Sequence, residues 1–497
     1  MKKITALMLV LLMLVPSMVA CSESNPETPD EAGTTGTENP TATAEEETAP
    51  APEETEITDE LPEITFEGSD YVILTRNCCP SHTNGIYIEE LTGDVVNDAV
   101  YDRNIVLEER FDIHIAQPVL GNDGDPTMLT ASVTAGDNAY DSVIYHYRHL
   151  GSSAAGGYLL DTTQASYIDY EKPWWYQGVN DAYSVGGHYY VLTGMYDLDN
   201  YYDTVCTYFN TNMMNELYPD EDIYSIVKEG RWTADMLETL AEGATMDVDG
   251  NGVMDHAVDR FGYGQDNGFS FVYQFAWEQP ITQRDAEGIP THCINTEKQV
   301  QIVEKLYHTL FEASPVIKNE DGSARSTAFK EGRCLFMVDR LFASVQLRDM
   351  EQDFGIIPMT KFDESQTNYY SHATAHTSAA GIPKGKTQEQ IEKSAIILEA
   401  MAAGGFKTVR PAVYDVALKS KYARDDTTYE MIDLVIQGKT ADFADVFDNW
   451  GLSYTLDILV ARSQKKDWAS HFKANEKPQA KLIEKTVKQF MELDTAP

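Results

Sequence analysis

Apolar positions in the first part of the globular region switch between strand-like and helix-like spacing. The continuous apolar run Tyr71–Leu74 predicts a buried strand, and the polar residues 75–85 that follow predict a loop at its carboxyl end. A helix is expected next, because apolar residues recur at helical spacing at Val96, Val100, Leu107 and Phe111. Ile113 and Ile115 then alternate as a strand, and residues 140–145 predict another. This order favours a parallel α/β sheet.

A second region of the same kind follows. Its strands are predicted over 204–210, 334–338 and 354–358. Thr233 and Thr296 are expected to cap helices between them, since a threonine hydroxyl can accept a bond from a free N–H group of the first turn. Residues 373–383 predict an extended crossing. A capping box at Thr387 and Gln390 then opens an almost wholly helical carboxyl-terminal part.

The amino terminus has the pattern of an export signal. Two lysines precede a short apolar run, and small residues precede Cys21, so residues 1–20 are expected to be a signal peptide. The window before Cys21 resembles a bacterial lipobox, which predicts lipidation of this cysteine. Met18 stands where leucine is usual, and plain cleavage or an uncleaved anchor are the alternatives. Residues 21–60 are acidic and nearly free of large apolar side chains, and they predict a disordered tether.

The charge of the chain excludes one class of partner. The formal net charge is −43, and it becomes −45 when Lys2 and Lys3 leave with the signal. Nucleic acid binding requires clustered lysine and arginine, so nucleic acid is not an expected partner. A strong negative charge is typical of a soluble body that repels its own copies.

The cysteines do not predict a structural framework. Besides Cys21 the chain has Cys78, Cys79, Cys206, Cys293 and Cys334, an odd number without metal-ligand spacing. The adjacent Cys78 and Cys79 could form a strained ring, but two free thiols are the favoured state.

Several short motifs occur in a fixed order along the globular part. They are NDAVYDRN at 97–104, YDSVI at 140–144, YFN at 208–210, GRWT at 230–233, FKEGRCLF at 329–336 and DFGIIP at 353–358. Together with the lipobox and the tether they resemble the family-one extracellular solute-binding proteins of ABC importers, the maltose-binding-like group.

The resemblance implies an α/β fold of the type II periplasmic-binding-protein-like class, with two lobes, each a mixed sheet flanked by helices, joined by a hinge. Lobe one would comprise residues 61–202 and 372–415, and lobe two residues 203–371 and 416–497. It also implies that a small solute, favoured to be a mono- or oligosaccharide, is captured between the lobes and delivered to a membrane permease. The protein would be lipid-anchored at the extracellular face of the cell membrane.

Candidate ligand contacts follow from the loops at the carboxyl ends of the strands, which converge at one edge of a parallel sheet. Sugar recognition requires flat apolar faces and planar polar side chains that bind hydroxyl groups in pairs. The candidates are Asn77, Tyr145, Tyr147, Arg148, Tyr201, Tyr202, Asp203, Trp277, Asp339 and Arg340. The aromatic run Pro173–Tyr176 is instead expected to pack within lobe one. His372 and His376 flank the second crossing, where a solvated histidine is commoner than a ligand contact.

The sharpest local motif is an acidic loop that resembles an EF-hand. Oxygen ligands recur at alternate positions with a glycine at the sixth, which suits a structural calcium ion. The candidate ligands are Asp247, Asp249, Asn251, Val253 through its carbonyl group, Asp255 and Asp259. Position twelve is Val258 rather than an acid, and Asp259 comes one residue late, so an Asx-rich turn remains the alternative.

Enzymatic motifs are not found. The chain has no Gly-x-Ser-x-Gly elbow, no His-Glu-x-x-His helix and no phosphate-binding glycine loop, and no cofactor is required by the predicted function. Two alternatives remain open: a calcium-stabilised cell-surface scaffold or adhesin, and a glycoside-acting enzyme that uses a pair of its many carboxylates.

Overall fold

The computed structural model describes residues 57–78, 80–122, 125–319, 323–373, 377–417, 426–447 and 453–493. The predicted signal, Cys21, most of the predicted tether, Cys79 and His376 lie outside these ranges. Within the described ranges, no helix has both the length and the apolar character needed to cross a bilayer.

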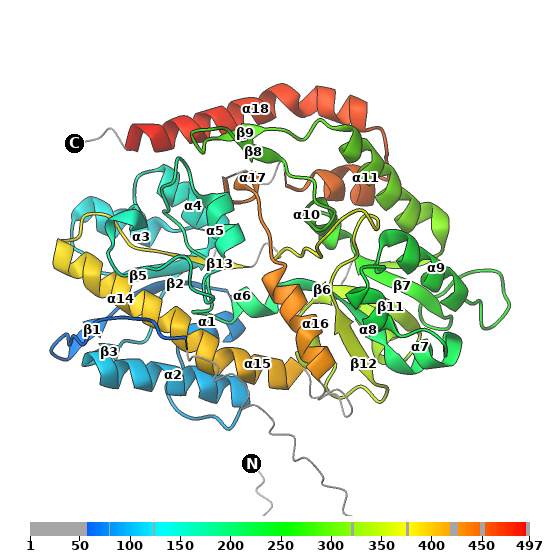
Figure 1. The fold of residues 1–497 in the computed structure, drawn as a ribbon, viewed down its shortest axis with the longest axis horizontal. Helices are drawn as coiled ribbons and strands as arrows, with labels where there is room; N and C mark the ends of the chain where they lie inside the picture. Colours follow the sequence, from blue (N-terminus) through cyan, green and yellow to red (C-terminus); the bar gives the residue numbers. More distant parts are fainter. Residues whose placement is uncertain are drawn as a thin grey trace, which may run out of the picture. The chain divides into compact units, whose positions relative to one another are not determined.

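The first sheet has four strands in the order β13-β5-β2-β4 (Figure 1). Their bounds are β2 Ile73–Asn77, β4 Val119–Asn122, β5 Ser142–His146 and β13 Ser378–Gly381. Strands β4, β2 and β5 run parallel, and β13 pairs antiparallel with β5. This sheet and the helices around it form lobe one.

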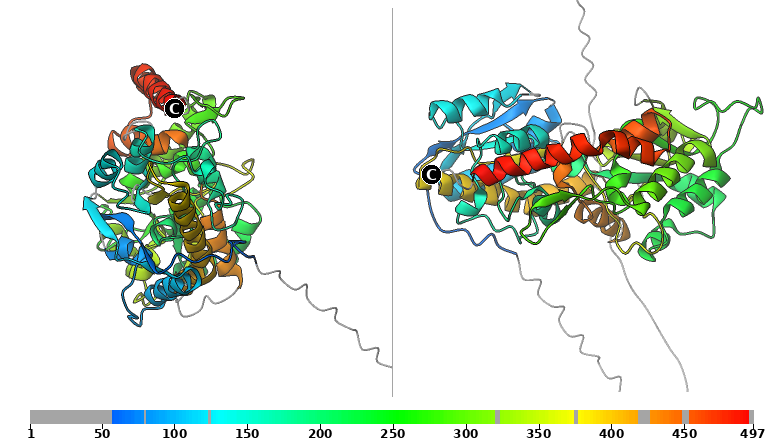
Figure 2. Two further views of the ribbon diagram at one scale, coloured as in Figure 1. Left: turned by 90° about the vertical axis from the view of Figure 1, so that its left-hand side faces the viewer. Right: turned by 90° about the horizontal axis from the view of Figure 1, so that it is seen from above.

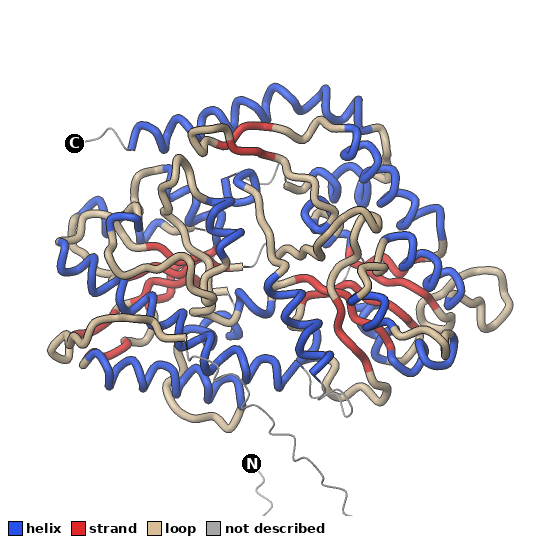
Figure 3. The backbone as a smooth tube through the Cα atoms, in the orientation of Figure 1, coloured by secondary structure: helices blue, strands red, loops and turns tan. Residues whose placement is uncertain are grey.

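The second sheet has five strands in the order β10-β7-β11-β6-β12, and Figure 3 shows it as a separate group of strands. Their bounds are β6 Val205–Asn210, β7 Phe261–Asp266, β10 Val316–Asn319, β11 Cys334–Arg340 and β12 Phe354–Ile357. Strand β6 runs antiparallel to both of its neighbours. This sheet and its helices form lobe two. Each lobe is therefore a mixed sheet, as predicted.

Helices cover both sheets. Those of the first part of the chain are α1 Pro80–Ile86, α2 Val95–Phe111, α3 Thr127–Ala135, α4 Tyr147–Ala155, η1 Thr162–Gln164, α5 Gln177–Tyr183 and α6 Asp199–Tyr202. Lobe two adds α7 Thr211–Leu217, α8 Ile223–Lys228, α9 Ala234–Ala244, η2 Asn267–Phe269, α10 Val272–Ala276, α11 Glu297–His308, η3 Thr309–Ala313, α12 Ser323–Lys330 and α13 Ala343–Gln346. The remaining helices are α14 Gln388–Gly404, η4 Gly405–Val409, α15 Arg410–Ala417, α16 Asp426–Gln437, α17 Phe443–Phe447, η5 Asp457–Arg462 and α18 Trp468–Leu493.

The predicted helix caps are confirmed. Thr233 accepts a hydrogen bond from the Met236 N–H at 3.3 Å, and Thr296 accepts one from the Gln299 N–H at 3.0 Å. Thr387 and Gln390 form both bonds of the capping box. The predicted apolar stripe of α2 is buried as a whole. Local patterns were sufficient here because caps and stripes depend on residues within a few positions of one another.

One predicted strand belongs to a different sheet. The strand predicted at Ile113 and Ile115 is β3 (Ile113–Ile115), which among the described residues pairs with β1 (Ser69–Tyr71) in a two-stranded sheet. The parallel neighbour of β2 is instead β4, which the sequence pattern missed. Its residues Val-Leu-Gly-Asn have no strand-like alternation, so pairing with β2 rather than local preference makes this segment a strand.

Two segments connect the lobes on the side of α18. The hairpin of β8 (Thr282–Arg284) and β9 (Pro290–His292) follows α10, and Arg284 donates to the backbone oxygen of Ser184 in lobe one at 2.8 Å. Helix α18 contacts α11 and β9 as well as α4, and Figure 2 shows it lying along both lobes. Helix α17 contacts α4 and α5. The predicted lobe boundaries stay a prediction.

A buried carboxylate orders the aromatic run Pro173–Tyr176. Glu399 of α14 accepts hydrogen bonds from the indole N–H groups of Trp174 and Trp175 at 2.7 and 2.8 Å. Both indoles are almost fully buried, as the prediction of a packing role requires. Burial raises the pKa of Glu399 to about 7, although the two indole bonds oppose the shift.

Glu399→Gln should therefore remove part of the pH dependence of the free energy of unfolding. A carboxyl group whose pKa is raised by folding contributes its full stability below about pH 4.5, and that contribution is lost as the pH rises towards 7. The loss is roughly 3 kcal/mol, because one pKa unit corresponds to about 1.4 kcal/mol. Urea unfolding between pH 5 and 7.5 should show a smaller slope for Glu399→Gln than for the wild type. Glu389→Gln, at an exposed position of the same helix, is the control, and equal slopes for both variants would contradict the assignment.

Candidate functional site

Three chain segments lie side by side where the chain passes between the lobes. The first crossing, at Thr204, forms an antiparallel bridge with Ala373 of the second. The Val205 N–H donates to the His372 oxygen at 3.0 Å. The segment around Lys439 joins them through a bridge to Ser371. These three segments form the hinge between the sheets.

The carboxyl ends of the parallel strands face the hinge in both lobes. In lobe one Ser378, which begins β13 just after the second crossing, pairs with His146 at the end of β5. In lobe two Val205, which begins β6 just after the first crossing, pairs with Arg340 at the end of β11. Because parallel strands end at the same edge, the neighbouring strand ends lie there too. They are Asn77 and Asn122 in lobe one and Asp266 and Asn319 in lobe two.

Charged side chains gather at the lobe-two edge. Arg340 bonds Asp203 of the first crossing at 3.0 Å, and about a third of the Arg340 side chain is exposed. Arg325 of α12 pairs with Asp339 at 2.5 Å and lies 3.7 Å from Asp266. Burial raises the pKa of Asp203, with a further contribution from nearby Asp199, whereas Arg340 opposes the shift. This edge offers planar donors and acceptors that can bind vicinal hydroxyl groups.

A buried ionic cluster lies at the first crossing, on the lobe-one side. Asp199 of α6 accepts bonds from Arg76 at 2.9 Å, from His82 at 2.5 Å and from the Ser378 hydroxyl at 3.1 Å. Burial opposes ionisation of Asp199, but His82 and Arg76 lower its pKa below the ordinary value. Asp197 shows the opposite effect, because burial and the charge of Asp199 raise its pKa. Asp199 and Asp203 thus connect α6 to lobe one and to lobe two respectively.

A second buried ion pair joins α4 to α17. Arg148 donates to Asp445 at 2.7 Å, and the Tyr147 hydroxyl donates to the same carboxylate at 3.1 Å. His372 of the second crossing lies 2.9 Å from the other carboxylate oxygen. Burial would raise the pKa of Asp445, but His372 and Arg148 lower it overall. The Arg148 guanidinium also lies 4.6 Å from the centre of the Tyr454 ring.

Solved structures with the same arrangement of lobes are known. A cyclo/maltodextrin-binding protein complexed with maltotetraose is 14% identical, covers 85% of this chain and 96% of its own, and superposes with a TM-score of 0.53. This chain has the two-lobe fold of the periplasmic binding proteins. Two further solved structures give lower TM-scores. They are the Thermus thermophilus maltotriose binding protein (13% identity, 85% and 99% coverage, TM-score 0.46) and the Streptomyces glaucescens GacH receptor (11%, 86% and 98%, 0.48).

Sequence comparison gives no further information about the protein. No protein-family model matches the chain, and no curated protein matches it. At identities this low the superposition establishes the binding-protein fold alone. The first of the structures named above is described as a binding protein.

Within this binding-protein fold, the predicted aromatic contacts are buried. The Tyr145 hydroxyl lies near the backbone oxygen atoms of Asn122, the last residue of β4, and of Asp125, to which it can donate. Tyr201 donates to the Gly405 oxygen at 3.2 Å, and the Trp277 indole donates to Thr360 at 3.3 Å. Tyr202 packs edge-on against Phe342. None of these four side chains, nor Tyr147, is more than 8% exposed, so none presents an open ring face in this conformation.

The predicted polar contacts are divided between the two edges. Asn77 is exposed at the lobe-one edge, whereas Asp203, Asp339 and Arg340 gather at the lobe-two edge. Arg148 lies apart from them in the buried pair with Asp445. Their roles as ligand contacts stay predictions.

The sequence interpretation missed several charged residues of these clusters, namely His82, Asp197, Asp199, Asp266, Arg325 and Asp445. Only Asp199 had a usable signal, since it lies close to the predicted boundary between the lobes at residues 202 and 203, whereas the strand that Asp266 ends was not predicted.

The acidic loop places its carboxylates together. Oxygen atoms of Asp247, Asp249 and Asp259 lie within 4.8 Å of one another. Asp259 is fully buried and accepts backbone N–H bonds from Val248 and Asp255 at 2.8 and 2.7 Å. Asp247 accepts the N–H groups of Gly250 and Gly252, and these bonds lower its pKa. The late position of Asp259 therefore does not prevent it from facing the other two carboxylates. The donor set is oxygen-only and suits a hard cation.

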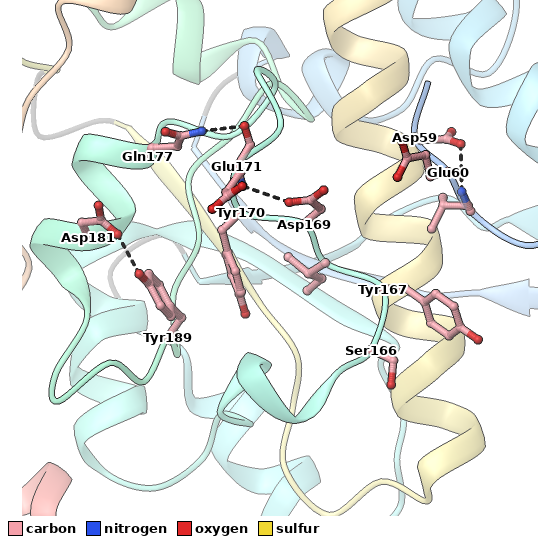
Figure 4. A pocket seen from close by; sticks show the side chains of 12 residues that line it. Asp59, Glu60, Ser166, Tyr167, Asp169, Tyr170, Glu171, Gln177, Asp181 and Tyr189 are labelled. Carbon is pink, nitrogen blue, oxygen red and sulfur yellow. Dashed lines mark hydrogen bonds between the residues drawn. The ribbon is translucent and has the colours of Figure 1, made fainter. Parts of the chain in front are cut away.

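A cavity lies elsewhere, at the edge of lobe one (Figure 4). It has a volume of about 720 Å³ and is lined by residues of segments 59–61, 166–171 and 177–189. Tyr170 and Tyr189 stack in its wall with ring centres 4.5 Å apart, and the Tyr189 hydroxyl donates to Asp181 at 2.7 Å. Neither a strand end nor a hinge residue contributes to its lining. This cavity is therefore separate from the interlobe edges.

Proposed function

We propose that this protein is an extracellular solute-binding protein that captures a mono- or oligosaccharide between its two lobes. The observation that supports this most is the placement of polar strand ends at the hinge-facing edges of both sheets: Asn77 and Asn122 in lobe one, Asp266 and Arg340 in lobe two. Amide, carboxylate and guanidinium groups can each bind two neighbouring hydroxyl groups. The similar cyclo/maltodextrin-binding protein was solved with maltotetraose, which agrees with this class of solute.

Capture requires a solute that binds both lobes. A solute stabilises the closed arrangement of the lobes only to the extent that it binds the closed arrangement more tightly than the open one. We propose that the captured solute is then delivered to the permease of an ABC importer. A lipid on Cys21 would hold the protein at the extracellular face of the cell membrane, with the acidic tether as spacer.

Titration with maltose, maltotriose, maltotetraose and ribitol tests the proposal. Calorimetry should give one site per chain, and small-angle scattering should show a smaller radius of gyration with the bound solute than without it. Chromatography of the mixture after a day should show intact sugar. Cleavage of the sugar would favour the glycoside-acting alternative. Failure of every member of a wider sugar and polyol panel to bind would reject the proposal.

Asn77→Ala should weaken binding without affecting folding. Its side chain is exposed at the lobe-one edge, and a lost pair of hydrogen bonds to a hydroxyl group corresponds to about 1–2 kcal/mol, or roughly a tenfold increase in Kd. Calorimetric titration with the tightest sugar of the panel measures the change. Asn97→Ala on the outer helix α2 is the matched control and should bind as the wild type does. Equal affinities for the two variants would remove Asn77 from the site.

We also propose that the loop 247–259 binds a structural calcium ion through Asp247, Asp249, Asn251, Asp255, Asp259 and the Val253 carbonyl group. Support comes from the buried Asp259 carboxylate, whose hydrogen-bond partners among the described residues are backbone N–H groups rather than cations. Such an ion would stabilise the loop of lobe two and would take no part in solute capture.

Removal of calcium should lower the melting temperature. A ligand at a hundredfold excess over its Kd stabilises the folded state by about 2.7 kcal/mol, so a chelator should lower the midpoint by several degrees and added calcium should restore it. Asp249→Asn should abolish this response, whereas Asp349→Asn at an exposed position should retain it. An unchanged midpoint in chelator would leave the loop as an Asx-rich turn. A calcium response in a protein that binds no solute would favour the cell-surface scaffold.

A further inference from the structure

Two buried histidines lie at the hinge. His82 of α1 is fully buried and contacts the Asp199 cluster beside the first crossing. His372 of the second crossing is 2% exposed and contacts Asp445 of α17. A neutral imidazole has one donor and one acceptor nitrogen, whereas an imidazolium has two donors. The groups around each ring therefore determine whether that histidine is a neutral imidazole or an imidazolium.

Both ring nitrogens of His82 face acceptors. Its Nδ1 lies 2.5 Å from the Asp199 carboxylate, which can only accept. Its Nε2 lies 2.7 Å from the Thr75 hydroxyl, and that hydroxyl donates its single proton to the Ile144 carbonyl oxygen at 2.7 Å. The Thr75 oxygen must then accept from Nε2. With the Thr75 proton on the Ile144 oxygen, the His82 ring is fully bonded only when both nitrogens hold a proton, whereas a Thr75 hydroxyl turned towards Nε2 would suit a neutral ring.

His372 also has an oxygen atom without a proton near each ring nitrogen, but its Nε2 is not aligned for a hydrogen bond to Asp445. Its Nδ1 lies 2.6 Å from the Thr440 carbonyl oxygen, and its Nε2 lies 2.9 Å from the Asp445 carboxylate. A carbonyl oxygen and a carboxylate both lack a proton to donate. The ring also stacks on Phe275 with centres 4.1 Å apart, so lobe two covers one of its faces. A neutral ring would bring a lone pair against one of the two oxygen atoms.

Other charged groups surround each ring. Around His82 they are Asp199, Arg76, Asp197 and, further along the hinge, Asp203, Arg340 and Lys439. Around His372 they are Asp445, Arg148 and the hydroxyl groups of Tyr147, Tyr183 and Tyr454. Burial lowers the pKa of Lys439 to about 7 and raises that of Asp197, so these groups titrate in overlapping ranges. Histidine effects must therefore be measured as differences between variants.

A metal ion is the competing interpretation for the first cluster. Ligand atoms of His82, Asp197 and Asp199 lie within 4.8 Å of one another. Coordination through His82 would require a nitrogen without a proton, and both nitrogens face acceptors that bond to N–H groups. The Arg76 guanidinium also lies 2.9 Å from the Asp199 oxygen that His82 contacts, where a divalent ion would be repelled. The hydrogen-bond pattern therefore favours protonation of His82 over a metal ion bound to it.

We propose that His82 and His372 are both imidazolium ions in this arrangement of the lobes, so that assembling the hinge takes up two protons. Above about pH 6.5 an ordinary histidine is neutral, and holding these protons then opposes the assembled state. The assembled hinge is thus most stable at acidic pH, and its stability falls as the pH rises. If the protein captures a solute as proposed above, its affinity should fall in the same direction, but the proton uptake does not depend on that function.

Nuclear magnetic resonance of wild-type protein with 15N-labelled histidine tests the protonation state directly. At pH 7.5 at least two of the 11 histidines should keep protons on both ring nitrogens, while solvated ones have lost one. A spectrum at this pH in which every histidine is neutral would overturn the proposal. This measurement requires no variant and no solute.

The pH dependence of urea unfolding identifies the two residues. Each proton held only by the folded state changes the unfolding equilibrium constant by up to tenfold per pH unit. Between pH 6.5 and 8 the slope of His82→Gln and of His372→Gln should each be smaller than that of the wild type by up to one proton. His114→Gln, whose ring is largely exposed, should keep the wild-type slope. Wild-type slopes in both hinge variants would overturn the proposal, whatever the solute titration shows.

Discussion

Replacing Asp445 with alanine should destabilise the protein by about 3–5 kcal/mol. The carboxylate is buried, and it is the partner of Arg148 at 2.7 Å and of His372 at 2.9 Å. Without it the Arg148 guanidinium remains buried with no counter-charge, and breaking a buried pair from one side has a cost of this size. Urea unfolding at pH 7 measures the change.

Three further variants show whether the buried charge is responsible. Asp445→Asn keeps the shape and an acceptor oxygen, so it should fall between wild type and Asp445→Ala. Adding Arg148→Met to Asp445→Ala should recover part of the loss, because the uncompensated guanidinium is then gone. Glu312→Ala, which removes an exposed partner of Lys466, should change stability by no more than about 0.5 kcal/mol. A loss below about 1 kcal/mol for Asp445→Ala would show that water reaches this pair.

Gly405→Ala should destabilise the protein by about 2–3 kcal/mol and weaken solute binding. Gly405 has ordinary helical dihedrals, with φ of −58°, so its backbone does not require glycine. An added Cβ would instead lie 1.6 Å from the Met195 carbonyl oxygen, and the backbone would have to move. Met195 precedes Asp197 and Asp199 of the hinge, and the Gly405 oxygen accepts the Tyr201 hydroxyl of α6. A displacement of the backbone at Met195 or Gly405 should therefore also move the first crossing.

Thermal unfolding and solute titration together check this expectation. Gly178→Ala is the matched control, because it is also a helical glycine and the atom nearest to its added Cβ is 3.9 Å away. That variant should be neutral or slightly stabilised, since alanine restricts the unfolded chain. If Gly405→Ala behaved like Gly178→Ala, the close approach of Met195 would have to relax without cost.

Elements with a strong local pattern were predictable. Helix α2 combines an apolar stripe with a cap, and α14 begins with a complete capping box, so neighbours within a few residues determine both. Strand β4 lacks such a pattern and depends on pairing with β2. The same distinction explains β3, whose alternation predicted a strand correctly but could not indicate which partner it would pair with.

The candidate site was predictable in position but not in detail. Asn77, Asp203 and Arg340 were expected at the interlobe edges because they end strands or begin crossings, and the structure places them there. His372 was expected to be solvated, yet it is buried and its Nε2 lies 2.9 Å from the Asp445 carboxylate. His82 lies within a segment predicted to be a polar loop, and its partner Asp199 is 117 positions away. Arg148 and Asp445 are separated by 297 positions.

By itself the sequence determined the α/β class, the positions of the strongly patterned strands and helices and the polar ends of several strands, because these depend on periodicity and on neighbours along the chain. The tertiary structure alone decided which aromatic rings are buried and which charges meet at the hinge. A buried histidine or arginine needs an acidic partner, but 80 acidic residues are available and the local sequence does not distinguish among them. Folding selects the partner by bringing distant segments within hydrogen-bond distance, and the protonation of His82 and His372 follows from that selection.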